Sequence, residues 1–364
     1  MLRPILLVLL GVLWSSPAWG EVKERSSDAY PTALEQWQNH LQEVRRLRDQ
    51  ISTAVGEERS SLQQKYADAI VEGEQALAQF SRVAERQVSQ GGDSKEEASE
   101  FLQIRLQDLL ARDDFESASQ IGQLLIAHGF QTAGVYEGTA IAAYMTNQTQ
   151  LATDYFREAE KEGDLDDSSK QLLDGVAYRE KAWAEEQRLR QAELEADDLP
   201  RVRLSTDKGD IVVELFENEA PLSVANFVHL VDQGFYDGLS FHRVLPHRMA
   251  QGGCPQGDGT GGPGYTIPCE SYGDTARRHF RGSLSMAKKS ERNTAGSQFF
   301  FIFTPAQHLD GEYTVFGRIL EGMEVLAKLQ RRNPKNPAAA PPDRILKAVV
   351  ERRRDHEYQP TRNE

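Results

Sequence analysis

The chain has 364 residues, more than a single hydrophobic core usually supports, so at least two domains are expected. Its formal net charge of -14 is uneven, because residues 1–200 hold 20 Lys and Arg against 36 Asp and Glu, whereas residues 201–364 hold 22 against 20. Such an acidic first half repels a polyphosphate backbone, which argues against nucleic acid as a partner. We interpret the acidic excess and the short basic run at residues 352–354 as solvated surface.

Residues 1–20 have the pattern of a secretory signal peptide. Arg3 precedes an apolar run over residues 5–14, and Ala18 and Gly20 are small residues at the positions that a signal peptidase recognises. The run is shorter than the roughly 20 residues that span a bilayer, so no stable membrane insertion is expected after cleavage. The sequence therefore predicts an exported protein, periplasmic or secreted. Retention of this segment as a single membrane anchor is the alternative.

Residues 21–90 are predicted to form a helical hairpin. Apolar residues recur there at alternating steps of three and four, as in coiled-coil-like helices. The two runs are Leu34, Trp37, Leu41, Val44, Ile51 and Val55, and Leu62, Tyr66, Ala69, Ala76, Phe80 and Val83. Because Gly56 separates them, two helices with facing seams are favoured over one very long helix. Residues 90–94 then form a turn.

Residues 96–198 are predicted to be helical. One set of apolar positions has spacings similar to those of a tetratricopeptide helix pair, and a step of 34 residues backwards leads to a second set. These sets are Tyr136, Ala140, Ala143, Ala152, Phe156 and Ala159, and Leu102, Leu106, Leu109 and Ala118. A tetratricopeptide-like repeat and a generic helical bundle both fit this pattern, and either offers a surface for protein partners. A charged helix over residues 168–196 completes the region.

After Pro200 the pattern changes to short strands. A β-hairpin is predicted around the turn at residues 207–210. Further strands are expected at 240–244, 249–252, 282–287, 298–303, 315–319 and 345–350, and helices at 221–234 and 323–329. The chain is thus predicted to be a multidomain α + β protein, with an all-α N-terminal part and a closed antiparallel β-barrel of about eight strands, capped by two helices. The barrel domain covers residues 201–354, and residues 355–364 form a tail.

Two motifs in the barrel segment carry the chemistry. Residues 241–253 read Phe-His-Arg-Val-Leu-Pro-His-Arg-Met-Ala-Gln-Gly-Gly, and residues 297–300 read Ser-Gln-Phe-Phe. On these motifs, residues 201–354 resemble the cyclophilins, which are peptidyl-prolyl cis-trans isomerases, or rotamases. The resemblance implies a cyclophilin-like fold, isomerisation of Xaa-Pro bonds in proline-containing polypeptides, and no cofactor or metal.

The resemblance also implies site residues. Arg243 is the implied catalytic arginine, and Gln251 orients it and the substrate carbonyl. The implied substrate-binding residues are Met249, Gly259, Ala287, Lys288, Gln298, Phe300, His308, Leu309 and Tyr313. Rotation about the prolyl bond crosses a barrier of roughly 18–20 kcal/mol, because it breaks amide resonance. A permanently charged guanidinium suits this reaction, since its donors bind the prolyl nitrogen more strongly as conjugation is lost.

Three features depart from the cyclophilin pattern. Arg248 stands where cyclophilins commonly carry a pocket phenylalanine, which changes the shape of the rim. His308 replaces a tryptophan used by the drug cyclosporin, and Tyr313 stands where many members have histidine, so weak cyclosporin binding with retained activity is expected. The segment 288–292 is longer and more basic than usual, and either a solvated loop or a bias toward acidic substrates fits it.

Cys254 and Cys269 flank a Gly-rich loop. A disulfide that closes this loop and a pair of free thiols are both compatible with the sequence. Glycines at 257–262 match a dinucleotide-binding pattern, but Pro263 follows directly and no helix can start there. The spacing fits no common zinc site for the remaining candidate metal ligands, His242, His247 and Cys254.

The leading hypothesis is an exported peptidyl-prolyl isomerase that acts on folding polypeptides and whose acidic helical part recruits or spaces partners. One alternative is a catalytically weak module that binds proline-containing segments as a chaperone or scaffold. A third makes the helical half the functional element and the barrel an accessory. The intact set of Arg243, Gln251, Phe300 and Leu309 favours the enzyme.

Overall fold

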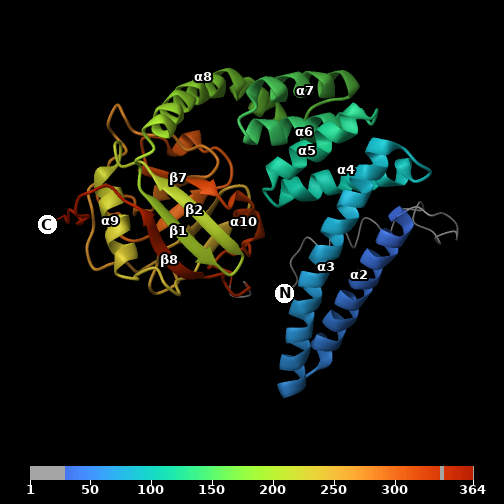
Figure 1. The fold of residues 1–364 in the computed structure, drawn as a ribbon, viewed down its shortest axis with the longest axis horizontal. Coiled ribbons are helices and arrows are strands. Elements are labelled where there is room, and N and C mark those ends of the chain that lie inside the picture. The colour runs from blue at the N-terminus through green and yellow to red at the C-terminus, as the bar shows by residue number, and fades with distance from the viewer. Residues whose placement is uncertain (1–28, 337–339, 364) are drawn as a thin grey trace.

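The computed structural model describes residues 29–336 and 340–363, so the predicted signal peptide, residues 1–20, lies outside the described residues. The chain forms a helical region, residues 29–196, and then a curled β-sheet, residues 201–352, which we call the half-barrel. Figure 1 shows the two side by side, with α8 (Asp167–Ala196) running from one to the other. Within the described ranges, no helix has both the length and the apolar character needed to cross a membrane.

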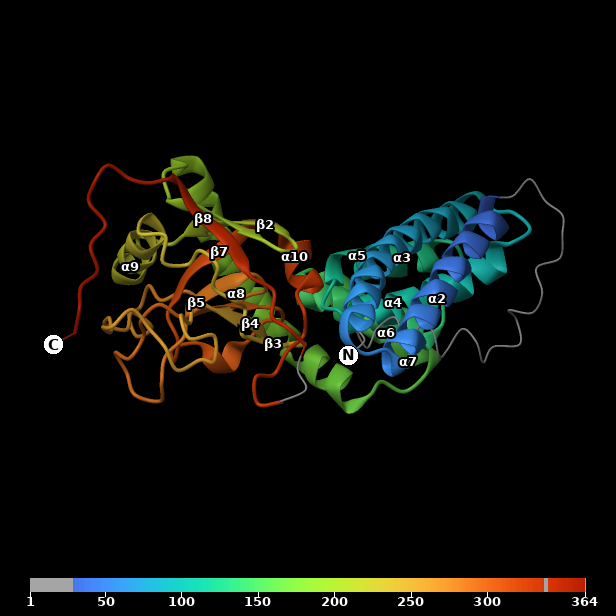
Figure 2. The same ribbon diagram turned by 90° about the horizontal axis from the view of Figure 1, so that it is seen from below.

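The helical region begins with the predicted hairpin. Helices α2 (Ala29–Thr53) and α3 (Gly56–Gln90) lie along one another (Figure 2). The seam residue Trp37 is 1% exposed and stacks on Phe80, with 5.4 Å between ring centroids. Val55 was expected on the seam but is 76% exposed, because it lies at the tip where the chain passes from one helix to the next.

Two helix pairs follow the hairpin. They are α4 (Lys95–Ala111) with α5 (Phe115–Ala127), and α6 (Ala133–Met145) with α7 (Thr149–Glu162). The turns inside the pairs are equivalent, because Asp113 and Asn147 lie 34 positions apart and both have a left-handed backbone, with φ of 65° and 61°. Asp and Asn are the residues other than glycine that most readily adopt this conformation. The turn and the start of the second helix thus recur at a 34-residue offset, although α4 begins 38 residues before α6.

The half-barrel is one antiparallel sheet with the predicted number of strands, in the order β3-β4-β6-β5-β7-β2-β1-β8. The strands are β1 (Arg201–Thr206), β2 (Gly209–Leu215), β3 (Arg243–Leu245), β4 (Met249–Gly252), β5 (Ser283–Met286), β6 (Phe299–Ile302), β7 (Val315–Glu321) and β8 (Ile345–Arg352). The sheet is not fully closed, in contrast to the predicted barrel. No ladder joins β3 to β8, and isolated bridges link Ser240 with Arg344 and Val244 with Arg332 at this seam.

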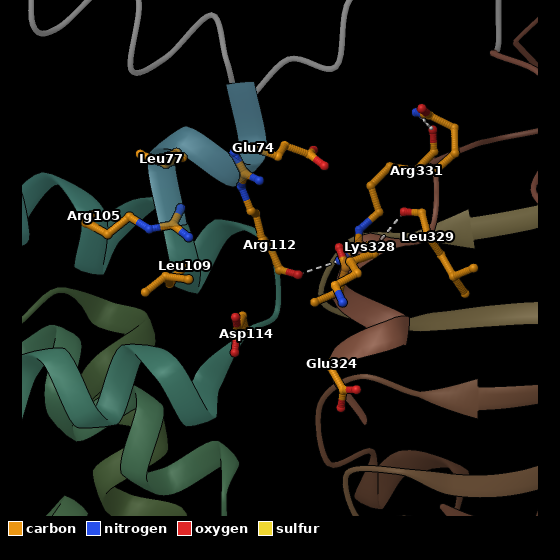
Figure 3. Close-up of a pocket in the computed structure, with 12 residues that line it drawn as sticks. Glu74, Leu77, Arg105, Leu109, Arg112, Asp114, Glu324, Lys328, Leu329 and Arg331 are labelled. Carbon is orange, nitrogen blue, oxygen red and sulfur yellow. Dashed lines mark hydrogen bonds between the residues drawn. The ribbon is translucent and has the colours of Figure 1, made fainter. Parts of the chain in front are cut away.

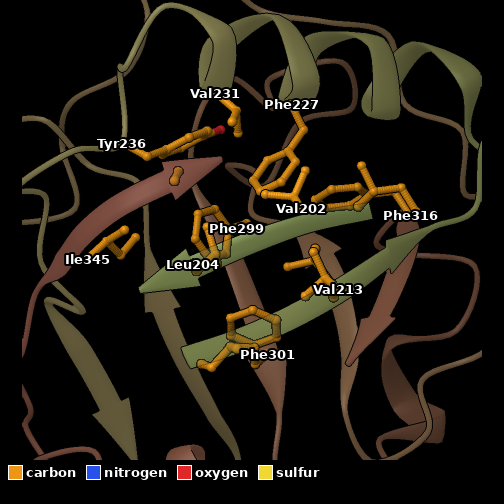
Figure 4. Packing of buried hydrophobic residues seen from close by; sticks show 14 of the residues in the cluster. Val202, Leu204, Val213, Phe227, Val231, Tyr236, Phe299, Phe301, Phe316 and Ile345 are labelled. Carbon is orange, nitrogen blue, oxygen red and sulfur yellow. The ribbon is translucent and has the colours of Figure 1, made fainter. Parts of the chain in front are cut away.

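Aromatic and aliphatic side chains fill the half-barrel. Helix α9 (Pro221–Asp232) begins with a proline at its first turn, and Figure 4 shows its Phe227 and Val231 pointing down onto the strands. Phe227 packs edge-on against Phe299 of β6, with 5.5 Å between centroids. Helix α10 (Met323–Lys328) lies on the side of the half-barrel that faces the helical region (Figure 1).

Helix α8 is attached to the half-barrel by buried ion pairs. Arg277 is 4% exposed and donates two hydrogen bonds to Glu186, at 2.8 and 3.0 Å, and another to Glu193. Its guanidinium also lies 3.8 Å from the centre of the Phe216 ring. Trp183 of α8 adds an edge-on contact with Phe280 at 5.0 Å.

A second joint lies at the turn between α4 and α5. The Asp113 side chain is fully buried and accepts hydrogen bonds from the His247 amide at 3.0 Å and from Arg331 Nη2 at 2.6 Å. The His247 ring lies 2.8 Å from the same carboxylate, and Arg281 donates to the Asp113 carbonyl at 2.7 Å. The expectation that the acidic excess is solvated surface is therefore wrong for this residue and for the acidic partners of Arg277, which are buried against half-barrel arginines.

A cavity of about 190 Å³ lies between α3, α4 and α10 (Figure 3). Its wall mixes acidic and basic residues, and one side is closed where Arg331 donates to the Arg112 carbonyl at 2.6 Å. None of the site residues implied by the sequence motifs lines this cavity.

Candidate active site

The two motifs meet on three neighbouring strands of the half-barrel. Arg243 of β3 pairs in register with Gln251 of β4, and Gln251 pairs with Phe300 of β6. Because side chains alternate between the faces of a sheet, these three residues share one face. Their neighbours in the chain, including Val244, Ala250, Phe299 and Phe301, are buried in the core on the other face.

A pocket of about 470 Å³ opens over this face. Its apolar wall is a small cluster separate from the main core, in which Phe300 and Ile302 are buried and Met249, Leu309 and Tyr313 pack against them. The Phe300 and Tyr313 rings meet edge-on at 5.6 Å. A compact ring such as that of proline fits such a hollow, which combines apolar walls with a few polar groups.

The pocket collects most of the site residues implied by the sequence. Those lining it are Arg243, Met249, Gln251, Ala287, Lys288, Phe300, His308, Leu309 and Tyr313. Gly259 and Gln298 lie outside the lining but are tied to it. The Gln298 side chain donates to the Gly259 carbonyl at 2.9 Å and accepts from Gln251 Nε2 at 2.9 Å.

This chain of amides fixes Gln251 and leaves the arginine beside it free to bind a ligand. Gln298 also donates to the Gly261 carbonyl at 2.8 Å, so one side chain joins the glycine loop to the strand that carries Gln251. Among the described residues, the Arg243 side chain has no hydrogen-bond or ion-pair partner. A guanidinium with unused donors beside an apolar hollow can bind a substrate amide from one side.

Two histidines support the pocket in ways that the motifs do not reveal. His279 is buried behind Phe300, with the rings parallel and 6.3 Å apart, and its Nδ1 lies 2.9 Å from Asp310 at the end of the short helix η2 (Gln307–Leu309). His247 lines the pocket and is bound by Asp113 of the helical region. Sequence reasoning missed both, because each depends on a residue distant in the chain.

Cys254 and Cys269 are both free thiols, so the disulfide alternative is not the one found. The buried Cys254 sulfur accepts amide hydrogen bonds from Gly259 and Gly261, both at 3.3 Å. The Cys269 sulfur lies 3.5 Å from the Thr314 hydroxyl instead. Each sulfur is thus held at a different place, and the Gly-rich loop is organised by hydrogen bonds to one of them.

The described residues contain no group of three His, Cys, Asp or Glu side chains able to hold a metal ion. His242 is 1% exposed, and burial lowers its pKa below the ordinary value. It lies under the glycine loop, since a Cβ at Gly259 would come within 3.5 Å of its ring. His242 is therefore a core residue.

Comparison with known proteins agrees with this geometry. The family model described as cyclophilin type peptidyl-prolyl cis-trans isomerase/CLD matches residues 201–350. A peptidyl-prolyl cis-trans isomerase of Helicobacter pylori (strain ATCC 700392 / 26695) is 53% identical over 130 residues, which cover 35% of this chain and 78% of the relative. One from Synechococcus elongatus is 57% identical over 115 residues, covering 32% and 77%. Peptidyl-prolyl cis-trans isomerase B of Bacillus subtilis is 52% identical over 121 residues, covering 33% and 83%. The chain therefore belongs to the cyclophilin-type peptidyl-prolyl cis-trans isomerase family.

Proposed function

We propose that this chain catalyses cis-trans isomerisation of Xaa-Pro bonds in polypeptides, with Arg243 as the catalytic residue. The observation that carries the proposal is the guanidinium of Arg243, which has no partner in the described part of the chain and lies beside the apolar wall formed by Phe300, Met249 and Leu309. The family relationship and the names of the relatives support the same activity.

The chemistry needs no covalent step. The apolar wall holds the proline ring, and Gln251, anchored by Gln298, binds the adjoining carbonyl. As the bond twists, the prolyl nitrogen regains its lone pair, and Arg243 donates to it more strongly than to the planar ground state. The lowered barrier follows from this difference in binding.

The test is the exchange of a proline-containing peptide measured by NMR, which needs no coupled protease. Replacing Arg243→Ala removes the donor, and loss of one such donor costs about 100-fold or more in turnover. Arg243→Lys keeps the charge without the planar fork and is expected to recover only part of the rate. An Arg243→Ala protein that is folded and fully active rules out the proposal.

A second candidate function is a proline-segment chaperone or scaffold with weak turnover. Arg248 favours it, because this exposed residue stands at a rim position where cyclophilins commonly carry a phenylalanine. An open rim is expected to bind the proline ring more weakly. Tight peptide binding without accelerated exchange in the same NMR experiment identifies this alternative.

We further propose that the protein works after export, in a periplasm or outside the cell. The basis is the sequence of residues 1–20. The 34-residue offset between the helix pairs supports a tetratricopeptide-like region that binds protein partners. Cell fractionation with detection of the cleaved N-terminus tests the first point, and affinity capture with residues 29–196 deleted, compared with the full chain, tests the second.

A further inference from the structure

The lining of the pocket is rich in basic side chains. Arg243, Arg248 and Lys288 line it, together with two histidines, and no carboxylate is among the lining residues within the described chain. Neither Arg243 nor Arg248 has an ion-pair partner in that part of the chain. Other half-barrel arginines differ, since Arg277 and Arg331 are each held by a carboxylate.

The two cations outside the catalytic position lie at opposite ends of the pocket. Arg248 immediately precedes Met249, which pairs with Ile302 at the last position of β6. Lys288 follows β5, whose last residue, Met286, pairs with Phe299 at the first position of β6. A polypeptide lying along the pocket therefore has one cation near each of its ends.

The backbone holds Arg248 in place, whereas the Lys288 ammonium is positioned by contacts of its own. The Arg248 carbonyl accepts from the Phe303 amide at 3.0 Å, and the His247 amide just before it donates to Asp113. The Arg248 side chain itself is exposed. Lys288 is partly exposed, and its Nζ lies 4.8 Å from the centre of the Tyr313 ring in the pocket wall. The same Nζ donates to the neighbouring Lys289 carbonyl at 3.4 Å, and no carboxylate among the described residues pairs with it.

We propose that Arg248 and Lys288 make this pocket selective for proline segments flanked by acidic residues, so that the preferred substrates are polypeptides with Asp or Glu on either side of the Xaa-Pro bond. This inference rests on the proposed isomerase function. The selectivity is electrostatic, because the rim attracts carboxylates and repels ammonium groups before the proline ring is seated.

The expected size of the selectivity follows from the exposure of the ion pairs that Arg248 and Lys288 would form with an acidic peptide. An exposed ion pair changes an equilibrium by about 1.5- to 5-fold, so two cations together are expected to change kcat/KM by about 2- to 25-fold between acidic and basic peptides. The ratio falls in 1 M salt, where charges are screened beyond about 3 Å. The experiment compares three peptides that differ only in the flanking residues, which are Glu, Gln or Lys, by NMR exchange at low and high salt.

The Gln peptide separates the two hypotheses. If neither the Gln nor the Glu peptide is accelerated, the isomerase function itself is refuted. If all three peptides are accelerated equally, only the selectivity is refuted. Arg248→Gln and Lys288→Gln are each expected to lower the ratio of the Glu to the Lys peptide. Lys289→Gln is the matched control, because it removes the same charge one residue away, outside the pocket lining, and is expected to leave that ratio unchanged. A ratio that all three variants lower equally means that net charge, and not the rim, selects the substrate, and this outcome also refutes the proposal.

Discussion

Replacing Asp113 tests how the helical region and the half-barrel are coupled. Its buried carboxylate accepts from the His247 amide and from Arg331, and its backbone is left-handed. Asp113→Ala removes the charge and the acceptors and also disfavours this backbone conformation. Asp113→Asn keeps a side-chain oxygen and tolerates the backbone but lacks the charge.

The magnitudes follow from the partners that are left behind. The Arg331 side chain is only 14% exposed, and burial lowers its pKa, while the Asp113 charge acts in the opposite direction. Removing one partner of a buried ion pair costs about 3–5 kcal/mol, and the left-handed backbone adds about 1 kcal/mol for alanine. Asp113→Ala is therefore expected to destabilise the joint by about 4–6 kcal/mol. Asp113→Asn is expected to cost about 1–3 kcal/mol, the value of a hydrogen bond to a charged group.

Hydrogen exchange measures this joint directly, since the His247 amide donates to Asp113. Mass spectrometry of the segment 244–249 is expected to show much faster exchange in Asp113→Ala and a smaller change in Asp113→Asn. Glu116→Gln is the control, because Glu116 binds Arg281 at the same joint through a side chain that is 48% exposed, whereas the His247 amide donates to Asp113. Unchanged exchange of this segment in a folded Asp113→Ala protein refutes the coupling.

Three further predictions concern other parts of the molecule. Burial opposes ionisation of the Cys269 thiol, but hydrogen bonds from neighbouring hydroxyl groups outweigh burial and lower the pKa of Cys269. Iodoacetamide is therefore expected to modify Cys269 well before the buried Cys254, which mass spectrometry of the unreduced protein can check. Cyclosporin is expected to inhibit weakly, and His308→Trp to strengthen inhibition in the NMR assay; tight inhibition of the unmodified protein contradicts this. The Glu357 carbonyl and the Glu217 carboxylate raise the pKa of His356. Protonated His356 therefore stabilises attachment of the C-terminal tail, fully so below pH 6.5. This contribution is lost as the pH rises through the higher pKa of the folded state. Proteolysis of the tail is expected to accelerate over that range, and in His356→Gln to become independent of pH.

The sequence predicts what depends on local pattern and fails where distant segments meet. The motifs are enough to assign Arg243, Gln251 and Phe300 to one site through the cyclophilin resemblance, and the observed register places the three on one face of the sheet. The acidic residues of the helical region carry no such local signal. Glu186 is spaced like any solvated helix residue, and only the tertiary fold brings Arg277 against it. The incomplete barrel closure is likewise invisible, because it depends on where the chain before β8 meets β3.

The family match begins at residue 201, yet the support of the pocket extends beyond it into the helical region. The turn at Asp113 binds the His247 amide, His247 is followed by Arg248, and both residues line the pocket. The equivalent turn residue of the next helix pair, Asn147, accepts from Arg179 of α8 at 2.9 Å, so both turns use the same position to bind the element beside them. The exposed Arg248 thus directly follows a residue whose amide is bound by a carboxylate from outside the family match. The helical region therefore contributes to the scaffold of the pocket, because its Asp113 binds the amide of a residue that lines it.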